Sequence, residues 1–376
     1  MSNIDRKNCK IPISQDNSVF IVAEVGKGFI QTEADQPVEV YLKNAKKLAR
    51  LAKEARADAV KFQTHTVEDE QANITVVAPH FKGADRYNWV KRNTEATPVW
   101  FWQELKKYCD DIGILFFSTP MTRGAAKLLN EEVGVELWKV GSGDILDFVM
   151  LDYLASTKKP IIISGGMSTL AEVDWAVNFL KHRNSEMVLM HCVSKYPCPS
   201  EELNLRTIEF FNNRYGVPVG FSDHSIGVDC ALAAVALGAR VIEKHFSLSR
   251  DLWGSDHKVA MTPLELKTLV AGIRELENNP TKKEEYLNKE IVKAGLGQAD
   301  KILQTGEEQF RPFFRKTLVA ACDIKKGEVV NPEKLWAMRP QAHLNGLPSE
   351  KYEEILGRKA SVDLKKGDPI PIEFIS

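Results

Sequence analysis

Two histidines with matching surroundings lie within residues 217–257. His224 follows the apolar run VPVGF, His245 lies in the run ARVIEKHF, and a small-residue helical stretch separates the runs. This order is typical of a parallel β-α-β unit, whose strands end at the edge of the sheet where ligands bind. Neutral imidazoles are common ligands of transition metals, and two of them leave coordination positions open for a substrate. We therefore predict that His224 and His245 hold a divalent metal ion.

Polar side chains also lie in, or directly after, six other short apolar runs. They are Glu24; Lys61, Gln63 and His65; Ser118 and Thr119; Lys139, Ser142 and Asp144; Ser164; and His191, Ser194 and Tyr196. Charged groups are costly to bury unless they pair or bind a ligand. A layer of ion pairs is the simpler explanation for some of them, such as Glu243 and Lys244 in the last run. It does not explain so many polar groups at the ends of the runs.

The types of these side chains indicate the ligand. Two lysines, several hydroxyls and the glycine-rich turns GSGD and SGGM suit a phosphate, or a phosphate together with a carboxylate. Glu24 and Asp144 can bind hydroxyls or transfer protons, and a histidine-bound metal can polarise a carbonyl oxygen. We predict an anionic, phosphorylated substrate, a second substrate with a carbonyl group, and a divalent metal.

The elements that must position these residues alternate regularly along the chain. Predicted strands lie at 19–26, 59–65, 114–120, 137–144, 160–167, 187–197, 217–221 and 239–246, and the clearest predicted helices at 37–56, 97–111, 169–182, 203–214 and 262–277. Eight strand-helix units predict an α/β fold, a (β/α)8 TIM barrel. A doubly wound open sheet is the alternative, but the turn VGKGF after the first strand lacks the dinucleotide-binding glycine pattern.

The chain is too long for the barrel alone. We predict a barrel domain at 1–280, an extended polar linker at 281–312, and a small domain at 313–376 whose two K-K-G-[DE] turns suggest an internal repeat. A net charge of -1 gives no electrostatic indication of nucleic acid or membrane binding, and no apolar run is long enough to span a bilayer. Six irregularly spaced cysteines without a C-x-x-C pair indicate reduced thiols, so we expect a cytoplasmic protein.

The motifs IVAEVG, VKFQTH, FFSTP, KVGSGD, HCVSKYP, GFSDHS, VIEKHF and GSDH occur in this order. Together they resemble the sialic acid (N-acetylneuraminate) synthase family, and DIKKGEVVNPEKLWAMRP resembles its appended antifreeze-like (SAF) domain, of the β-clip type. The resemblance covers nearly the whole chain. It implies condensation of phosphoenolpyruvate with N-acetylmannosamine, or a close N-acyl hexosamine, and water, giving N-acetylneuraminate, a nine-carbon 2-keto acid, and phosphate.

The resemblance also implies roles for individual residues. The metal, typically Mn²⁺ with Mg²⁺ or Co²⁺ as alternatives, is expected on His224 and His245, which with Glu24 and Asp144 form the expected catalytic set. The expected phosphoenolpyruvate ligands are Lys61, Gln63, Thr119, Lys139, Ser142, Ser194 and Ser222. The expected sugar contacts are Glu24, Tyr196, Asp256 and Arg339. The family arrangement implies a homodimer in which each SAF domain caps the partner barrel and inserts Arg339.

Alternatives remain for the reaction. Asp144, Ser194 and the GSDH motif resemble the branch of the family that uses a 6-phosphorylated sugar, to give the 9-phosphate product. The basic residues Lys82, Arg86, Lys91 and Arg92 of the insertion at 66–95 could then bind that phosphate, although a solvated face is the simpler explanation. A legionaminate-type acceptor is a further alternative. From other classes we consider a Schiff-base aldolase using Lys139 and a non-catalytic carbohydrate-binding protein.

Overall fold

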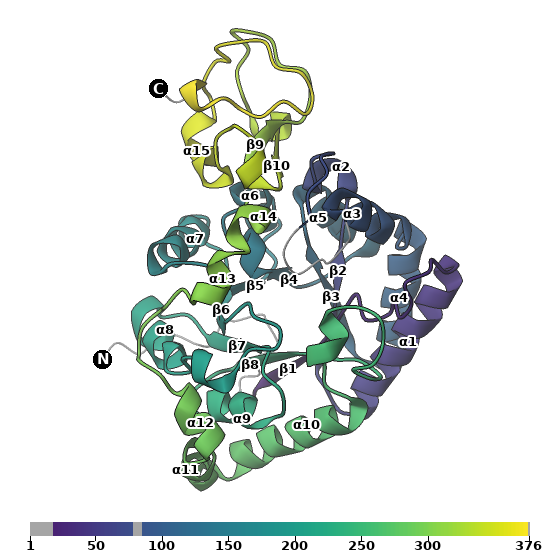
Figure 1. Cartoon of the computed structure of the whole chain (residues 1–376), viewed down its shortest axis with the longest axis vertical. Coiled ribbons are helices and arrows are strands. Elements are labelled where there is room, and N and C mark those ends of the chain that lie inside the picture. The colour runs from purple at the N-terminus through teal and green to yellow at the C-terminus, as the bar shows by residue number, and fades with distance from the viewer. Residues whose placement is uncertain (1–17, 78–84, 375–376) are drawn as a thin grey trace.

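The computed structural model describes residues 18–77 and 85–374, which form a barrel with a small domain at one end (Figure 1). The barrel contains eight parallel strands. Their bounds are β1 Phe20–Gly26, β2 Ala59–Thr64, β3 Leu115–Pro120, β4 Trp138–Val140, β5 Ile161–Ser164, β6 Met187–Cys192, β7 Val219–Asp223 and β8 Val241–His245.

The strands form one sheet in the order β3-β2-β1-β8-β7-β6-β5-β4. The first and last strands, β1 and β8, pair in parallel, and the sheet edges β3 and β4 lie side by side, so the sheet curls into a barrel. This confirms the predicted TIM-like barrel and excludes the doubly wound alternative. Alternate residues such as Phe20 and Val22 pack inside the barrel, whereas Ile21 and Ala23 pack against the helices. Burial on both faces explains the nearly continuous apolar runs of the sequence.

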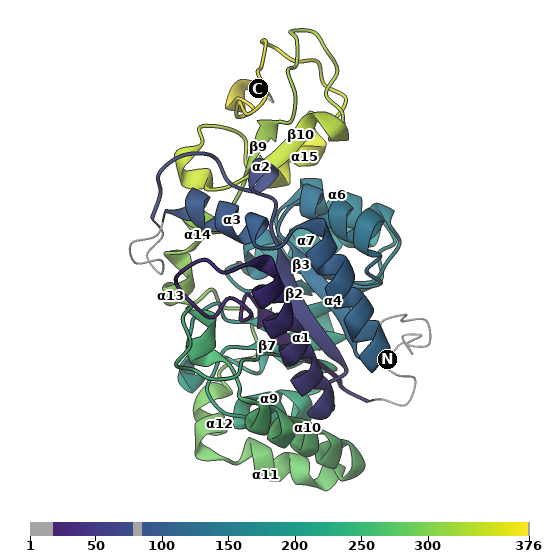
Figure 2. The same ribbon diagram turned by 90° about the vertical axis from the view of Figure 1, so that its right-hand side faces the viewer.

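Helices cover the outside of the barrel (Figure 2). Their bounds are α1 Val38–Glu54, α2 Val67–Glu70, α3 Arg86–Glu95, α4 Val99–Ile112, α5 Arg123–Lys127, α6 Phe148–Ser156, α7 Leu170–His182, α8 Thr207–Tyr215, α9 Asp229–Ala236 and α10 Pro263–Asn278. The helix predicted to start at Thr262-Pro263 does so, because the Thr262 hydroxyl and the Glu265 carboxylate cap its first turn reciprocally. No helix within the described ranges has the length and apolar character needed to cross a bilayer.

The C-terminal domain contains the antiparallel strands β9 Thr317–Ala320 and β10 Leu335–Met338 and the short helix α15 Tyr352–Ile355. Its two K-K-G turns are related by reciprocal hydrogen bonds. The Lys326 N–H donates to Asp363 Oδ1 at 2.8 Å, and the Lys366 N–H donates to Asp323 Oδ1 at 3.0 Å. Each turn thus donates to the aspartate that precedes the other turn, and this symmetry supports the predicted internal repeat.

The segment between the two domains, residues 283–316, differs from the expected extended linker. We call it the strap. It contains the helices α11 Lys283–Leu287, α12 Glu290–Gly295, α13 Thr305–Glu308 and α14 Arg311–Phe314. It runs along the barrel from α9 to the C-terminal domain (Figure 1). Val292 is fully buried, and the Leu205 N–H donates to the Gly295 carbonyl, so only the outer side of this charged segment is solvated.

Candidate active site

Lys61 and Lys139 form the cationic floor of the barrel mouth, and both ammonium groups are buried. Lys61 Nζ lies 3.0 Å from Glu24 Oε2 and 3.3 Å from Glu243 Oε1. Lys139 Nζ lies 3.8 Å from Glu243 Oε1, and burial lowers the pKa of Lys139. Glu243 therefore serves as an internal counter-ion between the two lysines, as the ion-pair explanation predicted. Lys244 likewise forms a buried pair with Asp223 at 2.7 Å.

Hydroxyl groups surround this floor. Lys61 donates to Thr119 Oγ1 at 3.1 Å, and the Ser222 hydroxyl donates to Glu243 Oε1 at 3.3 Å. Ser142 and Ser194 converge from different strand ends on Gly166: each Oγ would lie 2.6 Å from a Cβ at that position. The two hydroxyls therefore lie together against Gly166, and we call this pair the hydroxyl cradle. All the predicted phosphoenolpyruvate ligands except Gln63 thus lie on the β3 to β7 side of the mouth or on this floor.

The two predicted metal ligands are neighbours. The ring centroids of His224 and His245 are 5.4 Å apart, and the Tyr196 ring lies 4.1 Å from that of His224. His224 Nδ1 lies 2.8 Å from the Val193 carbonyl oxygen. Because this oxygen can only accept a hydrogen bond, Nδ1 carries the proton, and the Nε2 lone pair is available to a metal ion. Burial lowers the pKa of His245 to about 4, so this imidazole is neutral, as a metal ligand must be.

This donor set fits a divalent metal in part. The described residues contain no group of three or more His, Cys, Asp or Glu side chains arranged around one ion. The buried His245 Nδ1 has no hydrogen-bond partner among them. In their neutral forms the two imidazoles would fit two of the coordination positions, and substrate or water oxygens would have to fill the others.

Two of the predicted sugar contacts, Glu24 and Asp256, lie around Gly26, next to Lys61. A Cβ at Gly26 would lie 3.0 Å from Gln63 Nε2, 3.1 Å from Glu24 Oε1 and 3.5 Å from Asp256 Oδ2. Gln63 donates to Glu24 Oε1 at 2.8 Å, and burial, opposed by Lys61, raises the pKa of Glu24 to about 7. A carboxyl group with this pKa can both accept and release a proton near neutral pH.

Arg339, the fourth predicted sugar contact, comes from the C-terminal domain and lies at Asp144. Its guanidinium pairs with Asp144, and Lys316 Nζ lies 2.9 Å from Asp144 Oδ1. The structure therefore places Asp144 as a docking point for the C-terminal domain rather than as a free carboxylate. Within this single chain, the domain docks on its own barrel, through a bridge between Gln71 and Arg339. The exchange between two chains stays a prediction.

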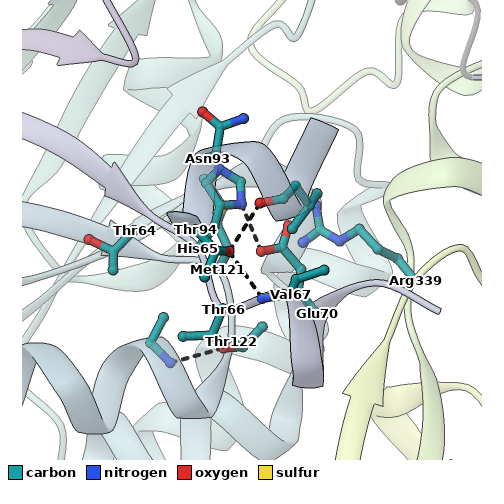
Figure 3. Close-up of polar contacts among 12 residues, drawn as sticks. Thr64, His65, Thr66, Val67, Glu70, Asn93, Thr94, Met121, Thr122 and Arg339 are labelled. Atoms are coloured by element: carbon teal, nitrogen blue, oxygen red, sulfur yellow. Dashed lines mark hydrogen bonds and ion pairs between the residues drawn. The ribbon is translucent and has the colours of Figure 1, made fainter. Parts of the chain in front are cut away.

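A histidine-glutamate pair lies beside this docking point (Figure 3). His65 Nδ1 lies 2.7 Å from Glu70 Oε2, and both side chains are buried. Burial opposes ionisation of Glu70, but His65 and, to a smaller extent, Arg339 lower its pKa. Strand periodicity placed His65 on the face of Lys61 and Gln63 but did not identify its partner. Lys27 was missed entirely: its buried ammonium has no hydrogen-bond partner among the described residues, and burial lowers its pKa to about 7.

The described basic residues of the insertion have separate surroundings. Arg86 is buried and stacks over the Trp89 and Phe314 rings. Lys91 lies 3.9 Å from Glu95, whereas Arg92 pairs with Asp35 at 2.5 Å. Lys82 lies outside the described residues. Lys91 and Arg92 each have an acidic neighbour of their own, which favours the solvated-face explanation, and the phosphate role stays a prediction.

Replacing Lys316 with methionine is expected to destabilise the protein. Lys316 Nζ, which is buried, bridges Asp144 at 2.9 Å and Asp147 at 2.7 Å, so its loss leaves buried carboxylates short of a cation. Removing one partner of a buried ion pair typically costs about 3 kcal/mol. Urea unfolding should show this loss, while the exposed Lys326→Met should unfold like the wild type. Equal stability of both variants would contradict the docking role of Lys316.

Comparison with known proteins gives the same two parts. The family model described as NeuB family matches residues 48–285, and the SAF domain model matches residues 315–375. N,N'-diacetyllegionaminic acid synthase of Campylobacter jejuni is 33% identical, covering 87% of this chain and 93% of that protein. Human N-acetylneuraminate-9-phosphate synthase is 30% identical, covering 95% and 92%. The structure of a spore coat polysaccharide biosynthesis protein from Bacillus subtilis superposes with a TM-score of 0.76 at 29% identity, covering 96% of each chain.

Proposed function

Since the chain belongs to the NeuB family and carries a SAF domain, we propose that it condenses phosphoenolpyruvate with N-acetylmannosamine, or a close N-acyl hexosamine, and water. The products are a nonulosonic acid, N-acetylneuraminate for that acceptor, and phosphate. One observation carries the proposal: two buried lysines, two hydroxyls that converge on Gly166, a histidine pair and a carboxyl-amide group gather at the same barrel mouth, where Glu24 contacts Lys61. The mouth thus offers cations and hydroxyls to an anion, and carboxyl, amide and imidazole groups to a polyhydroxylated partner.

The two lysines of the floor and the hydroxyl cradle suit phosphoenolpyruvate. Lys61 and Lys139 would exchange part of their pairing with Glu243 for the carboxylate and phosphate of the substrate. Ser142 and Ser194, which converge on Gly166, would donate hydrogen bonds to phosphate oxygens. Such pre-placed donors need no reorganisation when negative charge moves onto the leaving phosphate.

The reaction then balances as follows. The enol carbon C3 of phosphoenolpyruvate forms a bond to the aldehyde carbon of the open-chain sugar, and water adds at C2. The bond from C2 to the bridging oxygen breaks, phosphate leaves, and a 2-keto acid remains. Of the two water protons, one ends on the former aldehyde oxygen and the other on phosphate. Glu24, with a pKa raised to about 7 by burial, is the group able to carry a proton between these oxygens.

His224 and His245 would hold the divalent ion, which we propose to be Mn²⁺. A bound ion of this kind acts as a Lewis acid on the aldehyde oxygen of the sugar. Tyr196, packed on His224, and Asp256, near Glu24, flank the same space and would orient the sugar. Lys139 is the candidate for an aldolase-type Schiff base, but its ammonium donates to Ser164 Oγ at 2.7 Å and belongs to the cationic floor.

The charges around the acceptor side favour an unphosphorylated sugar. Glu24, Glu70 and Asp256 all act on the buried Lys27 ammonium, which has no hydrogen-bond partner among the described residues. Hydroxyl and acylamino groups of a neutral sugar would supply acceptors to this ammonium. Lys91 and Arg92 each have an acidic neighbour, Glu95 and Asp35. Human and Campylobacter relatives are named for different products, so a 6-phosphorylated or legionaminate-type acceptor is the alternative.

An acceptor panel tests this proposal. Phosphate release from phosphoenolpyruvate is measured with N-acetylmannosamine, its 6-phosphate and a diacetylated hexosamine of the legionaminate type. We expect turnover with the plain N-acyl sugar, and we expect the Lys91→Ala/Arg92→Ala double variant to keep the same preference. Turnover of the 6-phosphate alone, with a selective rise of its KM in the double variant, would contradict the neutral acceptor. No phosphate release with any acceptor would favour a non-catalytic binding protein.

A further inference from the structure

The strap holds the backbone of one barrel residue, Met167, on both sides. Its N–H, in the turn after β5, donates to Glu307 Oε1 at 2.7 Å. Its carbonyl accepts hydrogen bonds from Arg311 Nη1 at 2.7 Å and from Arg315 Nη2 at 2.6 Å. Met167 has a φ of +51°, a conformation that favours glycine, so the turn is fixed by its surroundings rather than by its own preference.

Glu307 connects this turn to the next one. Its carboxylate is fully buried, and the same Oε1 atom accepts a hydrogen bond from the Ser194 N–H at 2.8 Å. Its second oxygen accepts from the Gln304 N–H within the strap at 3.2 Å. One carboxylate thus joins the turns that follow β5 and β6. A buried carboxylate bound by backbone N–H groups forms charge-assisted hydrogen bonds, which are stronger than neutral ones.

These turns carry the hydroxyl cradle. Gly166, against which the Ser142 and Ser194 hydroxyls lie, directly precedes Met167. The third turn is held as well, because Arg315 donates to the Ser142 carbonyl at 3.2 Å. The strap therefore contacts each of the three turns that meet at the cradle. These hydrogen bonds are made to backbone N–H and carbonyl groups of the turns.

We propose that Glu307, assisted by Arg311 and Arg315, is a positioning residue for the phosphoenolpyruvate phosphate. It holds the turns so that the Ser142 and Ser194 hydroxyls point at one ligand. This inference rests on the proposed function, because the phosphate is the ligand that the cradle would bind. The strap continues directly into β9, so docking of the C-terminal domain and phosphate binding are coupled, and each strengthens the other.

The variant Glu307→Gln tests the role of the charge, since it keeps the shape and one acceptor oxygen. We expect the KM for phosphoenolpyruvate to rise about tenfold, with kcat and the acceptor KM changed less than about twofold. Glu308→Gln is the matched control, because Glu308 is the exposed neighbour on the same helix and should keep wild-type constants. Equal rises in both substrate KM values would point to a general structural defect and would overturn the inference.

Two further measurements keep this inference separate from the proposed function. Calorimetry of phosphoenolpyruvate binding without acceptor should give a weaker Kd for Glu307→Gln. Hydrogen exchange at the Met167 and Ser194 amides should be faster in that variant. A wild-type chain that does not bind phosphoenolpyruvate would contradict the proposed function. If Glu307→Gln binds phosphoenolpyruvate as tightly as the wild type although its Met167 and Ser194 amides exchange faster, the positioning role is overturned. If Glu307→Gln does not fold, the variant Arg311→Lys at the partly buried Arg311 must show the same selective KM rise, and an unchanged KM overturns the inference.

Discussion

Chains in which His224 or His245 is replaced by alanine are expected to remain folded and to lose turnover by about a thousandfold. Each substitution removes one of only two protein ligands for the proposed metal. Lewis-acid stabilisation of a developing charge is worth several kcal/mol, and about 1.4 kcal/mol corresponds to a tenfold change in rate. Phosphate release measures the loss of turnover. The electron paramagnetic resonance signal of free Mn²⁺, measured during titration with protein, reports binding independently.

The control for this experiment is His182→Ala, because His182 lies exposed in the last turn of α7. It should bind Mn²⁺ and turn over like the wild type. If His245→Ala keeps full activity in the presence of a chelator, the metal assignment is wrong. If it binds Mn²⁺ normally but does not turn over, the histidines act on the substrate directly and not through the metal.

The residues at strand ends could be predicted because they follow from two simple rules. Parallel strands end at one face of a barrel, and side chains alternate along a strand. Lys61, Lys139, His224 and His245 meet in the structure for these reasons, and the resemblance supplied their roles. The start of α10 was equally predictable, because a threonine, a proline and a glutamate at the right spacing form a complete cap.

The contacts of the strap could not be predicted from the sequence. Glu307 and its partner Met167 are 140 positions apart, and a polar stretch with paired like charges has no periodicity that indicates a buried face. The stretch is polar because its outer side is solvated, whereas single residues such as Glu307 and Lys316 point inward. For the same reason Lys27 was missed, since a lysine in a glycine-containing turn is usually exposed.

Arg339→Ala is expected to lower kcat/KM for the acceptor about a hundredfold. The Arg339 guanidinium is 2% exposed and pairs with Asp144, and its backbone N–H donates to the Glu70 carbonyl at 2.9 Å. Truncating one partner of a buried charge pair costs roughly 2–5 kcal/mol. Lys316 still neutralises part of the Asp144 charge, so the protein should stay folded. Steady-state kinetics with varied acceptor measure the effect, and an unchanged acceptor KM would contradict a role for Arg339 in the site.

The same variant tests which chain supplies Arg339. We propose a homodimer in which the C-terminal domains are exchanged, because exchange of identical elements preserves every contact that the domain makes with a barrel. An Arg339→Ala chain and a Lys61→Ala chain, coexpressed with different tags and purified as a heterodimer, would then contain one intact site per dimer. We expect about half of the wild-type activity per dimer. A heterodimer as inactive as either parent would mean that each domain stays on its own barrel, as in Figure 1, and would contradict the exchange.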